Sequence, residues 1–139
     1  ACETVKKKCH LEITNLLIPG ENDSENDICQ LVDWIAANLG RDTPLHFSRY
    51  FPRYRMDAPP TPAATLLRAR ELAIRKLDYV YLGNMDSQIG SDTRCPSCGT
   101  VLIRRNGYSI SVNKSLRKDA AGKKASCPSC NRSTNIILA

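Results

Sequence analysis

The chain of 139 residues carries one short pattern twice, Cys-Pro-Ser-Cys at 95–98 and again at 127–130. In each pattern proline fixes φ inside a tight turn, and Gly99 or Asn131 can follow in the left-handed conformation. Two such pairs bring four thiolates within reach of one tetrahedral ion, for which Zn²⁺ is the usual occupant. The predicted zinc ligands are Cys95, Cys98, Cys127 and Cys130.

Two disulfides or a redox-active dithiol are the alternative interpretations of these cysteines. We favour the metal because two matched pairs rarely arise by chance. A site with four sulfur ligands has no open position for water or substrate, so we expect it to be structural rather than catalytic.

The remaining three cysteines indicate the cellular compartment in which the protein is expected. Cys2, Cys9 and Cys29 are scattered, the total of seven is odd, and no secretory signal is recognisable. We therefore expect free thiols and a cytoplasmic protein. No apolar run approaches the roughly 20 residues that a bilayer span needs, so no membrane association is expected.

The net charge of +6 is unevenly distributed. Residues 94–139 hold nine Lys or Arg and one Asp, a balance of +8, whereas residues 1–93 hold eleven Lys or Arg and thirteen Asp or Glu, a balance of −2. A basic surface can bind nucleic acid through its phosphates. A solvated surface that offsets the charge of the thiolates is the other interpretation, and the sequence leaves both open.

Residues 1–84 alternate between short apolar runs and helical patterns. The expected elements are a helix end at 1–8, strands at 11–18, 44–50 and 78–82, and helices at 24–39 and 61–77. This alternation predicts right-handed crossovers and a parallel sheet. Its first strand is almost continuously apolar, which favours burial on both faces. Three strands leave an open edge, so we expect a larger sheet or barrel in a longer protein, or dimers formed through that edge.

Residue types at the helix ends predict particular caps. Asp23 or Ser24 is expected to cap the first long helix and Gly40 to close it. Thr61 is expected to cap the second, with Pro62 at its first position.

The rest of the chain follows the plan of a zinc ribbon. A polar linker at 85–93 precedes it, and Asn106-Gly107 predicts a hairpin turn between strands at 101–105 and 108–112. The lysine-rich stretch 114–124 is expected to be a loop. The predicted ribbon covers residues 94–139.

Four segments of the first 84 residues carry a resemblance to a known family. They read LEITNLLIPGEND at 11–23, TPLHFSRYFPRYRM at 43–56, PPTPAATLLRARELA at 59–73 and DYVYLGN at 78–84, and CPSCG follows them. In this order the chain resembles the C-terminal part of a radical S-adenosylmethionine (SAM) enzyme of the AmmeMemoRadiSam system, related to pyruvate formate-lyase activating enzymes.

The resemblance implies an α/β fold: C-terminal β/α units of a partial parallel (β/α) barrel over 1–84, followed by the zinc ribbon. It also implies that the parent protein binds SAM and a [4Fe–4S] cluster and cleaves SAM reductively to a 5′-deoxyadenosyl radical. The family's cluster motif, C-x₃-C-x₂-C, is absent from this sequence. We therefore expect a fragment that holds Zn²⁺ and carries no catalytic residues of its own.

Some SAM contacts are expected from this part of the family's barrel. By position, Asn15 or Leu16 would lie against the adenine, and Ser48 or Arg49 near the ribose. Activating-enzyme relatives carry a histidine about where Arg49 stands. The arginines and aromatic residues of 49–55 can hold an anionic group or stack on one another.

Two other functions stay open. The first is a basic zinc-ribbon module that binds nucleic acid or a protein partner. The second is a purely structural cap for a barrel edge. A protein substrate or partner of the parent enzyme is compatible with the resemblance. Phosphate-binding loops and the common hydrolase and metalloprotease motifs are absent from the sequence.

Overall fold

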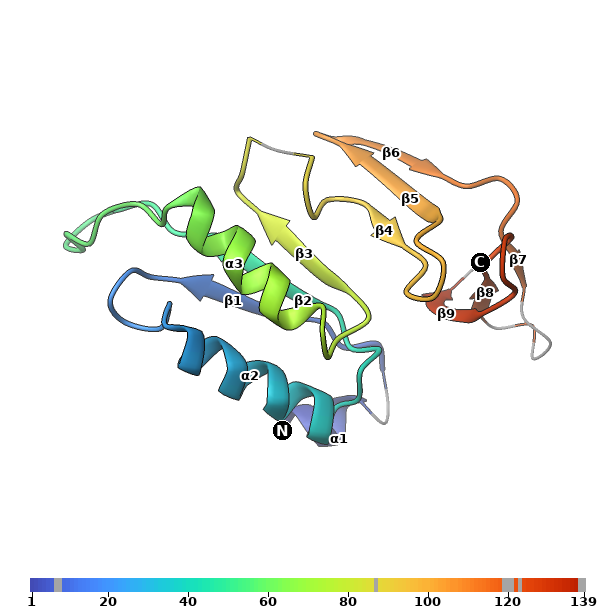
Figure 1. Cartoon of the computed structure of the whole chain (residues 1–139), viewed down its shortest axis with the longest axis horizontal. Coiled ribbons are helices and arrows are strands. Elements are labelled where there is room, and N and C mark those ends of the chain that lie inside the picture. Colours follow the sequence, from blue (N-terminus) through green and yellow to red (C-terminus); the bar gives the residue numbers. More distant parts are fainter. Residues whose placement is uncertain (7–8, 87, 119–121, 123, 138–139) are drawn as a thin grey trace. The chain divides into compact units, whose positions relative to one another are not determined.

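The computed structural model describes residues 1–6, 9–86, 88–118, 122 and 124–137 (Figure 1). The chain divides into two compact units, Ala1–Gly90 and Ser91–Ala139. The first contains helices and parallel strands, whereas the second is built from antiparallel strands. In the described part of the chain, no helix has the length and hydrophobicity that a bilayer crossing requires.

The first unit follows the expected alternation of strands and helices. Its elements are α1 (Cys2–Lys6), β1 (Ile13–Leu17), α2 (Glu25–Asn38), β2 (Leu45–Arg49), α3 (Ala63–Ala73) and β3 (Val80–Gly83). The strands form one parallel sheet in the order β1-β2-β3, in which Ile13 pairs with Leu45 and Leu45 with Val80. The prediction of a parallel β/α arrangement is thus confirmed.

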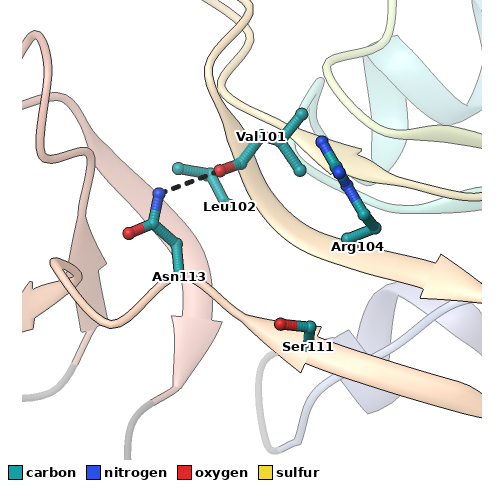
Figure 2. Close-up of a pocket in the computed structure, with 5 residues that line it drawn as sticks. All are labelled: Val101, Leu102, Arg104, Ser111 and Asn113. Atoms are coloured by element: carbon teal, nitrogen blue, oxygen red, sulfur yellow. Dashed lines mark hydrogen bonds between the residues drawn. The ribbon is translucent and has the colours of Figure 1, made fainter.

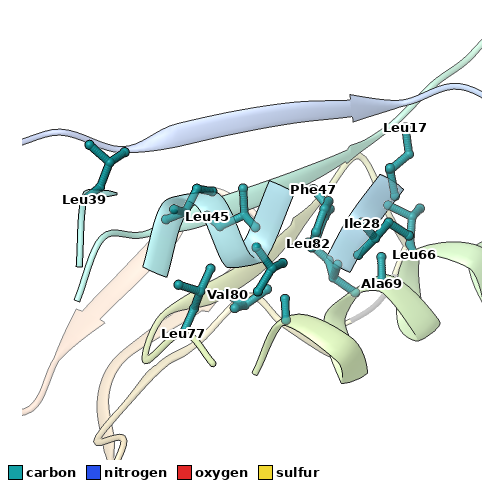
Figure 3. Packing of buried hydrophobic residues seen from close by; sticks show 13 residues of the cluster. Leu17, Ile28, Leu39, Leu45, Phe47, Leu66, Ala69, Leu77, Val80 and Leu82 are labelled. Atoms are coloured by element: carbon teal, nitrogen blue, oxygen red, sulfur yellow. The ribbon is translucent and has the colours of Figure 1, made fainter. Parts of the chain in front are cut away.

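The core of this unit lies between the sheet and two helices. Figure 3 shows side chains of all three strands meeting those of α2 and α3 in one cluster. The strand residues that enter it alternate along each strand: Leu17, Leu45, Phe47, Val80 and Leu82. Both helices therefore cover the same face of the sheet, as consecutive right-handed crossovers in one direction require.

The opposite face of the sheet, which we call the open face, is not covered by any helix of the described residues. It carries Thr14 and Leu16 of β1, His46 and Ser48 of β2, and Tyr81 of β3, all half-buried or exposed. The prediction that the first strand is buried on both faces is therefore wrong. Leu16 belongs to the apolar run of β1 but lies on the open face. The two helices cover only the opposite face of the sheet.

The ends of α2 match the expected caps. The Ser24 hydroxyl accepts a hydrogen bond from the backbone N–H of Asp27, 3.1 Å away, which satisfies one of the free donors of the first turn. At the other end Gly40 has φ of 91°, and its N–H donates to the carbonyl of Ile35. A positive φ here explains why glycine closes the helix.

Thr61 does not cap α3, contrary to the prediction. Pro62 is the N-cap, and no side chain bonds to the first turn. The buried Thr61 hydroxyl instead donates to the carbonyl of Leu17 (2.6 Å) and accepts from the N–H of Tyr50 (3.0 Å). It thereby ties together the carboxyl ends of β1 and β2. The helix also ends at Ala73, before the predicted end at residue 77.

The second unit consists of two small antiparallel sheets. Their strands are β4 (Thr93–Arg94), β5 (Val101–Asn106) and β6 (Ser109–Val112) in one, and β7 (Arg117–Lys118), β8 (Lys124–Ser126) and β9 (Ser133–Ile137) in the other. The predicted hairpin is present as β5–β6. Asn106 pairs with Ser109, so its loop residues are Gly107 and Tyr108, one position later than predicted.

The lysine-rich stretch is only partly the expected loop. Strand β7 lies within it and pairs with β8 through Arg117 and Ser126. Residues 119–121 and 123 of this stretch lie outside the described residues.

Candidate metal centre

Each Cys-Pro-Ser-Cys segment folds into the same turn. The N–H of Gly99 donates to the carbonyl of Cys95 at 2.8 Å, and the N–H of Asn131 donates to that of Cys127 at 2.9 Å. Gly99 and Asn131 have φ of 73° and 59°, the left-handed conformation predicted for them. The second cysteine of each pair therefore turns back toward the first.

The two turns bring their four sulfurs together. The Sγ atoms of Cys95, Cys98, Cys127 and Cys130 all lie within 4.8 Å of one another. Across the two turns, Cys95 is 3.5 Å from Cys130 and Cys98 is 3.5 Å from Cys127. These separations are far longer than the ~2.05 Å of a disulfide and close to the ~3.8 Å between sulfurs around tetrahedral Zn²⁺. The group can therefore hold one metal ion, as the spacing predicts.

Packing gives the centre one buried and one exposed side. Cys95 and Cys127 are buried against Leu102, with Leu116 and Ile136 packed around them. Cys98 and Cys130 are exposed. No other close group of three or more metal ligands occurs within the described ranges, so Cys2, Cys9 and Cys29 belong to no second centre there.

Hydrogen bonds adjust the acidity of the metal-free thiols. The Thr100 hydroxyl, 3.2 Å from the sulfur of Cys98, lowers the pKa of that thiol to about 6. Burial raises the pKa of Cys127, but backbone N–H groups outweigh it, so this pKa lies below its ordinary value. At Cys130 a backbone N–H lowers the pKa, yet burial and the three neighbouring sulfurs dominate and raise it to about 12. One thiol of the group is thus ready to bind a cation at neutral pH.

Polar side chains also join the two turns directly. The hydroxyls of Thr100 and Ser129 share a hydrogen bond of 2.9 Å, and the guanidinium of Arg132 donates to the hydroxyl of Ser97 at 2.9 Å. Each contact links a residue of one turn to a residue of the other. They join the two cysteine pairs in addition to any metal ion that the four sulfurs share.

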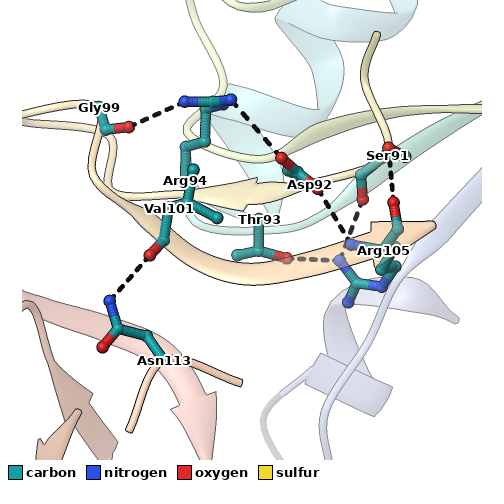
Figure 4. A network of polar contacts seen from close by, with 8 residues as sticks. All are labelled: Ser91, Asp92, Thr93, Arg94, Gly99, Val101, Arg105 and Asn113. Carbon is teal, nitrogen blue, oxygen red and sulfur yellow. Dashed lines mark hydrogen bonds and ion pairs between the residues drawn. The ribbon is translucent and has the colours of Figure 1, made fainter. Parts of the chain in front are cut away.

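A second network, not predicted from the sequence, fixes the first strand of this unit (Figure 4). The guanidinium of Arg105 donates to the carbonyl of Ser91 (3.1 Å) and the hydroxyl of Thr93 (2.8 Å). Asp92 accepts from the backbone N–H of Arg105 and forms an ion pair with Arg94 at 3.5 Å. These two arginines therefore serve the fold of the unit.

The sheet register divides the four predicted SAM-contact residues between two faces. Leu16 and Ser48 are direct partners in the β1–β2 ladder and lie on the open face near the carboxyl ends of their strands. Asn15 and Arg49 alternate with them and face the opposite way. The hydroxyl of Ser48 accepts from the side-chain amide of Asn84 at 3.0 Å.

Arg49 and its neighbours show the stacking that the sequence left open. The guanidinium of Arg49 lies 4.8 Å from the ring centre of Phe51 and donates to the carbonyl of Thr61. That of Arg55 lies 5.2 Å from the ring centre of Tyr54. Such contacts account for these arginines without a bound anion.

Sequence reasoning missed a polar cluster at the other end of the open face. The carboxylate of Glu12 contacts Nε2 of His10 at 2.9 Å and Nε2 of His46 at 2.7 Å, and the ring of His46 stacks on Tyr81. Burial raises the pKa of Glu12, but the two histidines outweigh it and the pKa is lowered. The parity of strand residues could have placed His46 and Tyr81 on one face, and Glu12 on the face of Thr14, but the contact between Glu12 and His46 depends on how the two strands pair.

Together these observations define a mixed α/β protein with a four-cysteine metal-binding group. Comparison with known proteins finds similarity to the uncharacterized protein MJ0808 of Methanocaldococcus jannaschii, with 40% identity over 140 residues. The alignment includes 99% of this chain, which spans 40% of the length of that relative. No family model matches the chain, and no solved structure matches it.

Proposed function

We propose that this chain is the C-terminal part of a radical SAM enzyme of the AmmeMemoRadiSam type. In this proposal the parallel unit is a segment of a (β/α) barrel, and the four-cysteine unit is a zinc ribbon. The [4Fe–4S] cluster, when bound and reduced, supplies the electron that cleaves SAM. This chain lacks the family's C-x₃-C-x₂-C motif, so in this proposal the ligands of that cluster come from another part of the longer protein.

One observation carries the proposal: the sheet is parallel, its strands follow the order of the sequence, and both helices lie on one face. A doubly wound sheet reverses its strand order between its two halves and has helices on both faces, and neither feature occurs among these three strands. A barrel keeps the sequential order, with helices outside and strand residues inside. The open face, with its mixture of polar and apolar residues, fits the interior of such a barrel.

The carboxyl ends of the strands are where a barrel of this kind binds its ligand. At this edge the open face presents the exposed side chain of Leu16 beside the hydroxyl of Ser48. An apolar side chain next to a hydroxyl suits a nucleoside, whose base is flat and apolar and whose ribose carries hydroxyl groups. Asn84 orients the hydroxyl of Ser48. We assign these residues to SAM binding, and Asn15 and Arg49 to supporting positions behind them.

The zinc ribbon has a structural role in this proposal. Four thiolates complete the coordination of Zn²⁺ and leave no position for a substrate. Zinc suits the donor set better than an iron–sulfur cluster because the sulfurs already lie at single-ion distances. Metal analysis of the purified chain should give close to one equivalent of zinc and little iron.

The test is SAM cleavage by the longer protein. After anaerobic reconstitution with iron and sulfide, that protein should form 5′-deoxyadenosine from SAM when dithionite is added. The 139-residue chain treated in the same way should form none. Failure of the longer protein to bind a cluster or to cleave SAM would overturn the proposal.

Two variants of the longer protein locate the SAM site. Leu16→Asp places a charge where the adenine would lie and should weaken SAM binding about tenfold or more. Thr14→Asp adds the same charge on the same strand and face, two residues nearer the amino end, and should leave SAM binding unchanged. If the two variants bind SAM with equal affinity, Leu16 is not part of the SAM site.

A further inference from the structure

The β5–β6 hairpin of the four-cysteine unit extends beyond the residues that surround the metal group. Leu102 of β5 packs against Cys95 and Cys127, but all four residues of β6 are exposed. Tyr108, in the hairpin loop, is fully exposed. No contact of the metal centre requires this aromatic side chain, so its position is unexplained by folding of the unit.

One cation on the hairpin differs from its neighbours. Arg94 and Arg105 take part in the network of Figure 4, and Arg132 joins the two cysteine turns. The side chain of Arg104 is exposed and makes no hydrogen bond or ion pair with any residue that the structure describes. Its guanidinium retains all five N–H donors for an external anion.

Arg104 lines a shallow pocket of about 320 Å³ on the hairpin (Figure 2). Leu102, which packs against Cys95 and Cys127, lines the same pocket. The other lining residues are Val101, Leu102, Ser111 and Asn113. Ser111 lies directly opposite Arg104 in the β5–β6 ladder and adds a hydroxyl donor. Asn113 is already engaged, because its amide donates to the carbonyl of Val101 and its oxygen accepts from Ser115. The pocket thus offers one guanidinium and one hydroxyl to an anion.

Charge favours the same kind of ligand. Residues 91–139 contain nine Lys or Arg and two Asp. Four thiolates around one Zn²⁺ leave a formal excess of two negative charges, which is too small to neutralise this surplus. A polyanion should therefore bind this unit more tightly than a single small anion does.

The geometry points to single-stranded nucleic acid as the ligand of this hairpin. In this proposal a backbone phosphate lies in the pocket against Arg104 and Ser111, and Tyr108 stacks on a base at the hairpin tip. A planar phenol ring accepts any base, so the binding is expected to show little sequence preference. A duplex, whose bases are already stacked, cannot use Tyr108 in this way.

The experiment measures fluorescence anisotropy of a labelled oligouridine and the matching oligothymidine with the zinc-loaded chain, from about 50 to 200 mM salt. Affinity should fall steeply as salt rises. Arg104→Gln should weaken binding and lower the salt slope by about one phosphate contact. Tyr108→Ala should weaken it about tenfold with the slope unchanged, because stacking is uncharged. Arg75→Gln makes the same charge change on the parallel unit and should have no effect.

Three results would overturn the proposal. The first is absence of binding at about 50 mM salt, which would leave the hairpin to a protein partner. The second is an equal loss in Arg104→Gln and Arg75→Gln. The third is a duplex bound as tightly as the single strands, with Tyr108→Ala neutral. Each result leaves the radical SAM proposal unaffected, because none of the three substituted residues lies in the proposed SAM site of the parallel unit.

Discussion

The two units secure their folds by different means. The parallel unit buries an apolar cluster under two helices but leaves the other face of its sheet exposed. Among its described residues, the four-cysteine unit buries little more than Thr93, Leu102, Ala125 and Thr134 beside two of its cysteines, and its strands are short. A core this small does not by itself balance the entropy of ordering the chain, so we expect this unit to depend on a metal ion held by its four cysteines. In this account the parallel unit is stabilised by packing and the four-cysteine unit by coordination.

Removing the metal should have the largest effect, and in one unit only. Cys127→Ser, or a strong chelator, should unfold residues 91–139, because binding of structural zinc contributes about 10–16 kcal/mol in comparable modules. The parallel unit should keep its hydrogen-exchange protection. Cys29→Ser, which changes a cysteine outside the centre, is the matched control. A chain whose four-cysteine unit stays folded without metal would break the comparison.

The converse change acts on the core of the parallel unit. Phe47 is fully buried in the central strand, so Phe47→Ala should cost that unit about 3–5 kcal/mol. Urea unfolding followed by hydrogen exchange should show an early transition in residues 1–90 only, with zinc still bound. Phe51→Ala removes an exposed ring and should change stability much less. Loss of zinc from the Phe47 variant would show that the units are not independent.

Thr61 tests a single buried contact. Thr61→Val leaves the carbonyl of Leu17 and the N–H of Tyr50 without their partner at the strand ends. The expected loss is about 1–3 kcal/mol in the free energy of unfolding of the parallel unit, which is measured as a lower urea midpoint. The control is Thr65→Val, in α3. A Thr61 variant as stable as the control would contradict the bridging role.

The pKa of the Cys98 thiol should determine how zinc affinity falls as the pH is lowered. Above pH 6 the Cys98 thiol, whose pKa is about 6, is already a thiolate, and below pH 6 the metal must displace its proton as well. Zinc affinity should therefore decline more steeply below pH 6 than above it. Competition with a chromophoric chelator between pH 8 and 5 measures this. Thr100→Val removes the hydrogen bond responsible and should move the change of slope to higher pH.

The smallest effect belongs to a helix end. Ser24→Ala removes the side-chain acceptor at the start of α2 and should lower the stability of the parallel unit by about 1 kcal/mol. Thermal melting of the zinc-loaded chain detects such a change. Ser109→Ala, which changes an exposed serine of β6 in the other unit, is the control. A shift in that control as large as in the Ser24 variant would contradict a local capping effect.

Much of this architecture could be predicted from local sequence. The twin cysteine pairs specify their own turns through Gly99 and Asn131, and Gly40 marks a helix end through its positive φ. Such features depend on a few neighbouring residues. The sequence also predicted the order of strands and helices, since alternation of apolar residues reflects which side is buried.

The errors came from tertiary contacts. Thr61 looks like a cap, but its hydroxyl bonds to Leu17, 44 positions away, and no local pattern shows this. Leu16 looks like a buried residue because its neighbours are apolar, yet it lies on the open face. Similarly, Glu12 has His10 two residues away but meets His46 only after β1 and β2 pair. Contacts between distant segments depend on strand register, which a single sequence does not specify.

The open edge of β1 offers the most direct test of the central claim. The N–H of Ile13 donates toward β2, to the carbonyl of Pro44, so the alternate amides of Thr14 and Leu16 point away from it. Hydrogen exchange should be measured on zinc-loaded samples of this chain and of the longer protein. A barrel segment predicts that these two amides become strongly protected in the longer protein, while β8 and β9 exchange equally in both. Equally fast exchange of Thr14 and Leu16 in the two proteins would contradict it.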